Sequence, residues 1–240
     1  MNEYLLLDIG NTNIKYALVS ENKFISKKTF NTSEVEGIIN EEIPSNIKNI
    51  FISSVVPEVN IHFENLHINS YFVSHDNISN IKVKIPNPKE LGSDLIINAS
   101  AAYELTNSRN LIIDHGTALT FCHVDNNGNY LGCLIFPGNR IASESLSKHT
   151  SQLSFIEMNN SDKLFGVNTE EAIGTGLFKG YIHLINGFIR EFKDTYSDIK
   201  VVGSGKGIEI FKNHIHLDIY EDNLTINGLN LFAKNILGIE

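Results

Sequence analysis

The chain has 240 residues, of which 42% are hydrophobic, enough for the core of one large domain or of two ordinary ones. Its 28 acidic residues outnumber its 19 basic residues, the formal net charge is −9, and no basic cluster offsets it, which argues against a nucleic acid partner. The N-terminus lacks a signal-peptide pattern and no stretch approaches the roughly 20 apolar residues of a membrane span, so we expect a cytoplasmic protein without membrane contact.

The chain opens with three predicted strands that form a meander between Tyr4 and Phe30. The first strand ends in "DIG", a Gly-Asn-Thr turn leads into the second, and "SENK" separates the second from the third, "FISKKTF". A helix, two buried strands and a second helix are then predicted over 33–41, 49–57, 71–75 and 90–106. This order predicts a mixed α/β fold.

The stretch from residue 110 to residue 136 repeats the opening pattern. It reads "LIID", "HGTA", "LTFCHV", "DNNGN" and "YLGCLIF". Aligning Asp8 with Asp114 also aligns Gly10 with Gly116, so the chain is predicted to contain two similar halves, each opening with a meander and an acidic turn.

Three more helices and another strand are predicted after the second meander. A helix follows Pro137-Gly138, and a long helix begins near Thr169, because Asn168 and Glu171 have the spacing of a capping box. In chain order, the later elements are the helix over 169–192, the strand in "IKVVGSGKG" and the helix in "LTINGLNLFAKNIL". The polar stretch at 106–110 marks the boundary between an N-terminal domain, 1–107, and a C-terminal domain, 108–240.

The two cysteines, Cys122 and Cys133, lie on either side of the tight-turn signal Asn127-Gly128. A two-residue turn there places the thiols directly opposite each other on neighbouring strands. A redox role is conceivable, but we favour two small, half-buried strand residues, because disulfides between facing strands are unusual in a reducing compartment.

Each acidic turn combines a carboxylate at the end of a strand with a glycine two residues later. Glycine lets backbone N–H groups approach phosphate oxygens, and the carboxylate can hold Mg²⁺ through water. A single Asp-x-Gly turn is also common in hairpins without function. Two copies, together with a third glycine turn at 203–207, favour a site for phosphate and metal.

Seven motifs occur in the order found in one known family. They are "DIGNTNIK" (8–15), "SSVVP" (53–57), "NPKELGSD" (87–94), "DHGTALTF" (114–121), "YLGCLIFPG" (130–138), "GVNTEEAIGTG" (166–176) and "LTINGL" (224–229). The chain resembles the superfamily of actin, Hsp70 chaperones and sugar kinases, and within it the type III pantothenate kinases.

This resemblance implies two actin-like (ribonuclease H-like) domains with mixed sheets flanked by helices and an active site in the interdomain cleft. The implied activity is the ATP-dependent phosphorylation of pantothenate to 4'-phosphopantothenate, the first step of coenzyme A biosynthesis, with Mg²⁺ and a monovalent cation, K⁺ or NH₄⁺. Family members are homodimers. Gly176 and Gly180 on the long helix would permit close approach at such an interface, although packing within the domain explains them as well.

The resemblance also implies roles for individual residues. The first turn would handle ATP phosphates, and Asp8 would hold Mg²⁺ through water; the residues concerned are Asp8, Gly10, Asn11, Thr12 and Lys15. In the second turn Gly116 and Thr117 would contact the nucleotide and Asp114 would bind the monovalent cation. Alternatively, Asp114 caps its own turn. His115, also in this turn, is expected at the surface.

Asp94 matches the family's catalytic base, a role that suits a carboxylate within reach of an alcohol. Without the resemblance, an exposed helix N-cap is the simpler interpretation of Asp94. Thr169 matches a threonine that contacts pantothenate, and a helix-start hydroxyl explains it equally well. The complete set of implied acceptor-binding positions is Ile85, Gly92, Ser93, Leu95 and Thr169.

Two acceptor positions depart from the family pattern. Leu95 stands where the family has an arginine that helps to hold pantothenate, and Ile85 stands where it has a tyrosine. Losing such a charge-assisted contact typically costs about 1.5–3 kcal/mol of binding. Three hypotheses follow: a pantothenate kinase in which Arg140 or Lys206 replaces the arginine, a kinase for a different small alcohol, or a non-catalytic nucleotide-binding regulatory relative. The sequence does not determine the nucleotide preference or the identity of the cation.

Overall fold

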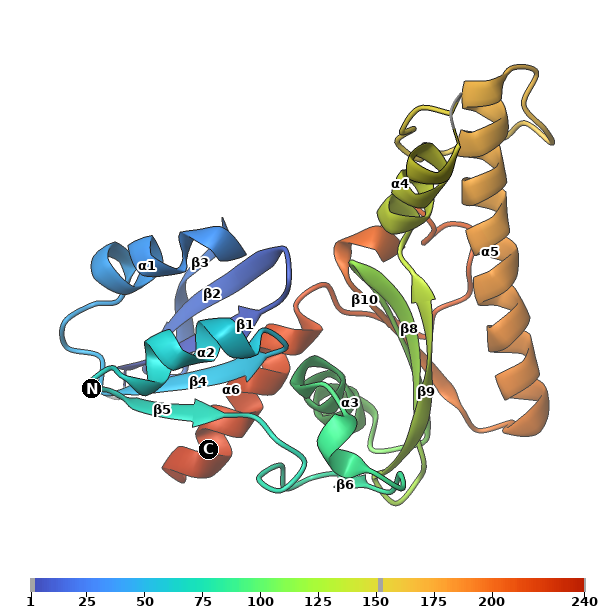
Figure 1. Ribbon diagram of the computed structural model, residues 1–240. Coiled ribbons are helices and arrows are strands. Elements are labelled where there is room, and N and C mark those ends of the chain that lie inside the picture. The colour runs from blue at the N-terminus through green and yellow to red at the C-terminus, as the bar shows by residue number, and fades with distance from the viewer. Residues whose placement is uncertain (1–2, 151–152, 240) are drawn as a thin grey trace. The chain divides into compact units, whose positions relative to one another are not determined.

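The structure is a computed structural model that describes residues 3–150 and 153–239 (Figure 1). The chain divides into two compact units. The first comprises Met1–Leu105 together with Asn223–Glu240, and the second comprises Thr106–Asp222.

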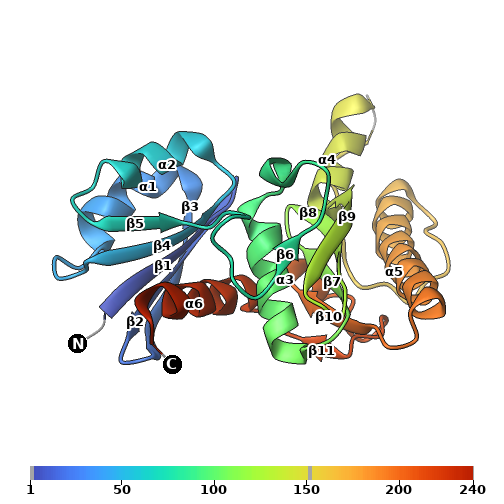
Figure 2. The same cartoon turned by 90° about the horizontal axis from the view of Figure 1, so that it is seen from below.

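The first unit contains a mixed sheet with helices on both faces (Figures 1 and 2). The strands of this sheet are β1 (Glu3–Ile9), β2 (Asn13–Ser20), β3 (Lys23–Asn31), β4 (Asn49–Ser54) and β5 (Asn69–Phe72), in the order β3-β2-β1-β4-β5. The short strand β6 (Lys82–Val83) follows β5 in the chain and is not part of this sheet. The helices are α1 (Val35–Gly37), α2 (Pro57–Glu64), α3 (Ser93–Thr106) and α6 (Leu224–Leu237), with short turns at Thr32–Glu34, Ile38–Glu42 and Pro88–Glu90.

The second unit repeats this strand arrangement. Its strands are β7 (Asn110–His115), β8 (Ala118–Val124), β9 (Asn129–Pro137), β10 (Lys200–Ser204) and β11 (Ile219–Tyr220), and its helices are α4 (Asn139–His149), α5 (Thr169–Thr195) and the turn Lys206–Ile208. The strands β9-β8-β7-β10-β11 correspond to β3-β2-β1-β4-β5: the first three are antiparallel in both units, and the remaining pairs are parallel. The predicted duplication and mixed α/β fold are confirmed.

The cores follow from the alternation of side chains along the strands. In the first unit, Leu5 and Leu7 of β1 pack with Phe63 of α2 on one face of the sheet. In the second unit, Leu111 and Ile113 of β7 belong to the cluster that α5 covers. The first strand of each unit is therefore buried. The acidic residue near the end of that strand is held in place by the packing of the strand in the core.

The last helix, α6, departs from the predicted domain division. The proposed C-terminal domain, 108–240, includes α6, but in the structure α6 packs on β1 and β4 of the first unit. Tyr4 Oη donates a hydrogen bond to Asn230 Oδ1 (2.7 Å), and the ring of Phe232 meets that of Phe51 edge to face at 6.0 Å. The apolar pattern of α6 indicates that the helix is buried, but not which sheet buries it.

The cysteine prediction is confirmed in register, whereas the predicted turn is wrong. Cys122 and Cys133 are directly opposite across β8 and β9, and both are free thiols. The connection is not a two-residue turn, because β8 ends at Val124 and β9 begins at Asn129. A register shift between His123 and Val124 restores the predicted pairing.

Candidate active site

The first acidic turn joins β1 to β2. Asp8 faces Lys15 across these strands, and the Lys15 Nζ lies 3.3 Å from the Asp8 carboxylate. The Gly10 N–H donates to the carbonyl of Asn13 (3.0 Å), which closes the turn. Burial raises the pKa of Asp8, and the charge of Lys15 opposes this. The turn therefore presents a carboxylate and an ammonium group together.

The structure brings Asp94 into the same region of the first unit as Asp8. Asp94 is the second residue of α3, and its Oδ1 accepts a hydrogen bond from the Leu95 N–H (2.8 Å). Burial raises the pKa of Asp94, the Leu95 N–H opposes this, and the negative charge of Asp8 raises the pKa further. Two carboxylates and Lys15 thus influence one another electrostatically.

Asp94 is not the exposed N-cap that its sequence context allows. The carbonyl of Gly92 accepts the Ile96 N–H (3.2 Å), which is the first bond of the helix, so Gly92 occupies the N-cap position. A Cβ added at Gly92 would lie 2.5 Å from Asp94 Oδ1. The absence of a side chain at Gly92 therefore leaves room for the Asp94 carboxylate in its present position.

The second acidic turn joins β7 to β8 in the second unit. The Gly116 N–H donates to the carbonyl of Ala118 (2.9 Å), and both Gly116 and Thr117 are exposed. The Gly138 N–H donates to the carbonyl of Thr117 (3.0 Å). A Cβ at Gly138 would lie 2.5 Å from that same oxygen, so the backbone that begins α4 lies directly against the turn.

Gly205 lies against Asp114 at the end of the neighbouring strand β10. Its φ is +84°, in the region that favours glycine, and an added Cβ would lie 2.5 Å from Asp114 Oδ1 and 2.7 Å from the His115 carbonyl oxygen. A carboxylate oxygen and a carbonyl oxygen therefore point to one side of the turn. Hard oxygen donors of this kind suit a potassium or ammonium ion.

His115 is fully buried, so the expectation of a surface position is wrong. Its ring packs against those of Phe211, with centroids 5.5 Å apart, and Tyr181, with centroids 5.4 Å apart. The Asn139 N–H donates to His115 Nε2 (3.3 Å), and burial lowers the pKa of His115 to about 4. The alternation of β7 explains the position, because Leu111, Ile113 and His115 share the face that α5 covers.

The other predicted acceptor positions differ in exposure. Leu95 is buried, with 8% of its surface exposed, and Ile85 is half-buried. Thr169 is exposed at the first position of α5. Asn168 caps this helix as predicted, since its side chain accepts the Glu171 N–H (2.9 Å). A helix-start position for the Thr169 hydroxyl therefore agrees with the structure, and its contact with a substrate stays a prediction.

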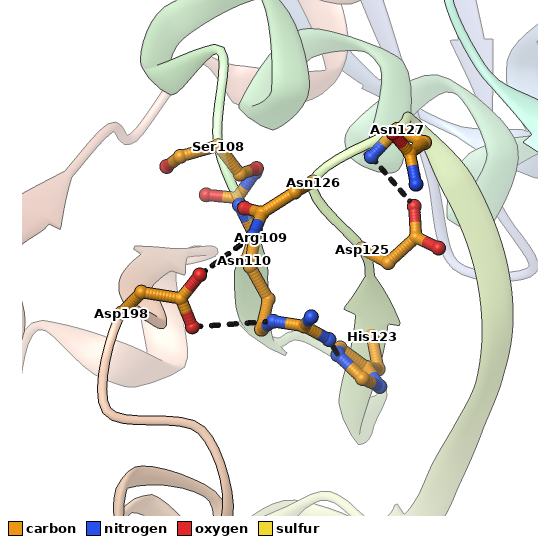
Figure 3. Close-up of polar contacts among 8 residues, drawn as sticks. All are labelled: Ser108, Arg109, Asn110, His123, Asp125, Asn126, Asn127 and Asp198. Carbon is orange, nitrogen blue, oxygen red and sulfur yellow. Dashed lines mark hydrogen bonds and ion pairs between the residues drawn. The ribbon is translucent and has the colours of Figure 1, made fainter.

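A polar cluster lies at the opposite ends of β7 and β8 from the second acidic turn (Figure 3). Arg109 Nε lies 3.3 Å from Asp198 Oδ1, and Arg109 Nη1 lies 3.3 Å from His123 Nε2. Asn126 joins them, because its Oδ1 accepts a hydrogen bond from the backbone N–H of Arg109 and its side-chain amide donates to the Asp198 carboxylate. These contacts tie the loop after β8 to the segment before β10.

The stability of the second unit should depend on pH through His123. Burial lowers the pKa of His123, Arg109 lowers it further, and Asp125 opposes both. Because the unfolded chain then binds the proton more readily than the folded one, stability should fall as the pH drops below the ordinary histidine value of about 6.5. Urea unfolding from pH 7.5 to 5 should show a steeper loss for the wild type than for His123→Phe, which keeps a ring against Phe192.

The exposed His149 provides the control for this experiment. His149→Phe should retain the pH profile of the wild type. Equal pH profiles for the wild type and His123→Phe would contradict the prediction.

Several residues of the candidate site are absent from the sequence-based prediction. Gly138 and Gly205 occur in conspicuous glycine motifs, but their contacts with the second turn join segments far apart in the chain. Ser53 stands beside Asp8 only because β4 pairs with β1. The residues that surround the two acidic turns thus depend on strand order, which local sequence does not determine.

Comparison with known proteins identifies relatives of this chain. A family model described as type III pantothenate kinase matches residues 4–191. A protein named type III pantothenate kinase from Listeria innocua is 32% identical, and the alignment covers 96% of each chain. A protein of the same name from Listeria monocytogenes serotype 4a is 31% identical with the same coverage.

Solved structures share the fold. A conserved putative Baf family transcriptional activator from Campylobacter jejuni has a TM-score of 0.68 at 23% identity, with 98% of this chain and 100% of that chain covered. A putative 2-dehydro-3-deoxygalactonokinase from Sinorhizobium meliloti has a TM-score of 0.64 at 11% identity, with coverage of 97% and 99%. At these identities the likeness is one of fold. The match to the family model and the near full-length relatives show more: this chain belongs to the type III pantothenate kinase family.

Proposed function

We propose that the protein transfers the γ-phosphoryl group of ATP to the primary hydroxyl of pantothenate, the first step of coenzyme A biosynthesis. The observation that carries this proposal is the half-buried Asp94 carboxylate beside Asp8 and Lys15, in a chain of the type III pantothenate kinase family. The family match favours this function over a kinase for another alcohol and over a non-catalytic nucleotide binder. Use of ATP as the donor favours a cytoplasmic location.

Asp94 is the group best suited to take the proton of the acceptor. Phosphoryl transfer needs a carboxylate that orients the hydroxyl and accepts its proton as the new bond forms. The raised pKa of Asp94 makes it a stronger base than an exposed aspartate, and Lys15 can offset charge on the phosphates. Asn11, Thr12 and Thr117 are exposed in the two turns and can donate hydrogen bonds to phosphate oxygens.

The donor atoms fit the two proposed cations. A magnesium ion keeps several waters and needs few protein carboxylates, so Asp8 can hold it through water. Such an ion would offset negative charge on the transferring phosphate. Asp114 Oδ1 and the His115 carbonyl, which converge at Gly205, offer hard oxygens to a monovalent cation.

The acceptor carboxylate must be held without an arginine at position 95. Leu95 is buried and has no charge to offer. Arg140 is exposed, and its Nε pairs with Glu144 Oε1 at 2.9 Å, a surface contact that costs little to exchange. Lys206 is also exposed. Alanine variants of Arg140 and Lys206 test the two side chains separately, because loss of the residue that holds pantothenate should raise the KM for pantothenate.

The proposed function is tested by ADP formation from MgATP with K⁺ or NH₄⁺, with and without pantothenate. We expect pantothenate-dependent ADP release and a product heavier by one phosphoryl group in mass spectrometry. Pantetheine, which lacks the carboxylate, is the comparison acceptor. Turnover with pantetheine but not with pantothenate would overturn the proposed acceptor. Turnover with neither would overturn the proposed kinase.

We also propose that the protein is a homodimer. Leu164, Phe165 and Val167, in the segment before α5, are 82%, 69% and 78% exposed. A Cβ added at Gly176 or Gly180 would meet no atom within 4 Å, so the described chain leaves this side of α5 uncovered. Exposed apolar side chains next to an uncovered helix support association through this surface.

Replacing Leu164 and Phe165 by Asp should convert the dimer to a monomer, because buried carboxylates at an apolar interface are strongly unfavourable. Sedimentation or light scattering measures the change in mass. Ile25→Asp is the control, since Ile25 is 60% exposed on β3 of the first unit. A dimer in the double variant, or a monomeric wild type, would contradict the proposed interface.

A further inference from the structure

Ser93, the first residue of α3, makes an unusually complete set of hydrogen bonds. The Ser54 N–H donates to Ser93 Oγ (2.8 Å), and the Ser93 hydroxyl donates to the Ser54 carbonyl (2.9 Å). Ser53 Oγ lies 3.2 Å from Ser93 Oγ. Because a hydroxyl has only one proton, and Ser93 uses it on Ser54, Ser53 must be the donor in this third bond.

The Ser93 hydroxyl therefore has no capacity left for a substrate. A serine hydroxyl offers one donor and two acceptor positions, and all three are occupied by Ser53 and Ser54. Ser53 is fully buried, and 8% of Ser93 is exposed. The substrate contact that the family resemblance implies for Ser93 does not fit this geometry.

The three bonds attach the start of α3 to the end of β4. Ser53 is the register partner of Asp8 on the parallel strands β4 and β1. Ser93 precedes Asp94 directly in the chain. One continuous path thus runs from Asp8 through Ser53 and Ser93 to Asp94, entirely within the first unit.

We propose that Ser93 is a positioning residue that fixes Asp94 beside Asp8. The inference rests on the proposed function, in which Asp94 accepts the proton of the acceptor hydroxyl. The Asp94 carboxylate accepts a hydrogen bond from the adjacent Leu95 N–H, and because both residues belong to α3, this bond moves with the helix. The attachment of α3 to β4 therefore decides where the carboxylate lies.

Ser93→Ala tests the proposal, and Ser100→Ala is its matched control. Ser100 lies about two helical turns further along α3. It is fully buried, and its hydroxyl donates to Asn80 Oδ1 (2.7 Å). Both substitutions remove a buried hydroxyl from the same helix, so a general loss of stability affects both, whereas a loss of positioning affects only Ser93→Ala.

We expect Ser93→Ala to lower kcat by about tenfold to a hundredfold, the scale of a displacement near 1 Å, while the KM for ATP stays within about threefold. Ser100→Ala should keep kcat within about twofold. A kcat for Ser93→Ala within the range of the control, or an equal loss in both variants, would overturn the positioning role. Should Ser93→Ala fail to fold, Ser53→Ala decides in the same way, because it removes one of the three bonds.

A crystal structure of each variant separates this inference from the proposed function. If the wild type does not phosphorylate pantothenate, the proposed function fails, and the position of Asp94 still tests the inference. A shift of the Asp94 carboxylate away from Asp8 in Ser93→Ala, but not in Ser100→Ala, supports it. An unmoved carboxylate in Ser93→Ala overturns it.

Discussion

Asp94→Asn should lower kcat by about 10²–10⁴-fold, because asparagine cannot accept the proton of the acceptor hydroxyl. The substitution preserves the size of the side chain, and the amide oxygen can still accept the Leu95 N–H. ATP affinity, measured by calorimetry, should therefore change little. Removing the negative charge also relieves repulsion from Asp8, so the variant should be at least as stable as the wild type.

Glu104→Gln is the control for this experiment. It makes the same isosteric change on the same helix, at an exposed position. Its kcat should match that of the wild type. Full activity of Asp94→Asn would exclude Asp94 as the base, and loss of ATP binding would point to a role in holding the nucleotide.

Gly205→Ala should have the second largest effect. The position requires a φ of +84°, and the new Cβ would also press on Asp114 Oδ1 and on the His115 carbonyl. The backbone strain alone costs about 1–3 kcal/mol. Displacement of the proposed cation ligands should reduce kcat by about tenfold or more and weaken its activation by K⁺.

Gly238→Ala is the control, because it introduces backbone strain without a steric clash. Gly238 has a φ of +65°, but an added Cβ would meet nothing within 4 Å. This control should lose stability in thermal unfolding without a change in K⁺ activation. If both variants respond to K⁺ as the wild type does, Asp114 is not the cation ligand.

The two acidic turns could be predicted because their signals are local. An apolar strand, an aspartate and a glycine within a few residues specify each turn, and the repetition at Asp8 and Asp114 predicts the duplicated architecture. In these respects local chemistry and the final fold agree. The pairing of Cys122 with Cys133 matches the prediction only because a register shift between His123 and Val124 offsets the longer connection.

The remaining features depend on contacts between distant segments. The apolar face of α6 indicates burial, yet only the structure shows that Phe232 packs on Phe51. The sequence likewise cannot show that the Ser93 hydroxyl is fully used by β4, or that Gly205 lies against Asp114. These features concern which segments meet, and a hydrophobic pattern specifies only that a face is covered.

The placement of α6 affects the order in which the protein can be completed during synthesis. The second unit is one uninterrupted stretch of chain, whereas the first needs Asn223–Glu240, which leave the ribosome after the second unit. The sheet that carries Asp8 therefore cannot be completed until α6 has been synthesised. Until then the face that Phe232 covers stays exposed, while the second unit can already fold. A protein shortened by its final helix should thus lose the unit made first and keep the one made later.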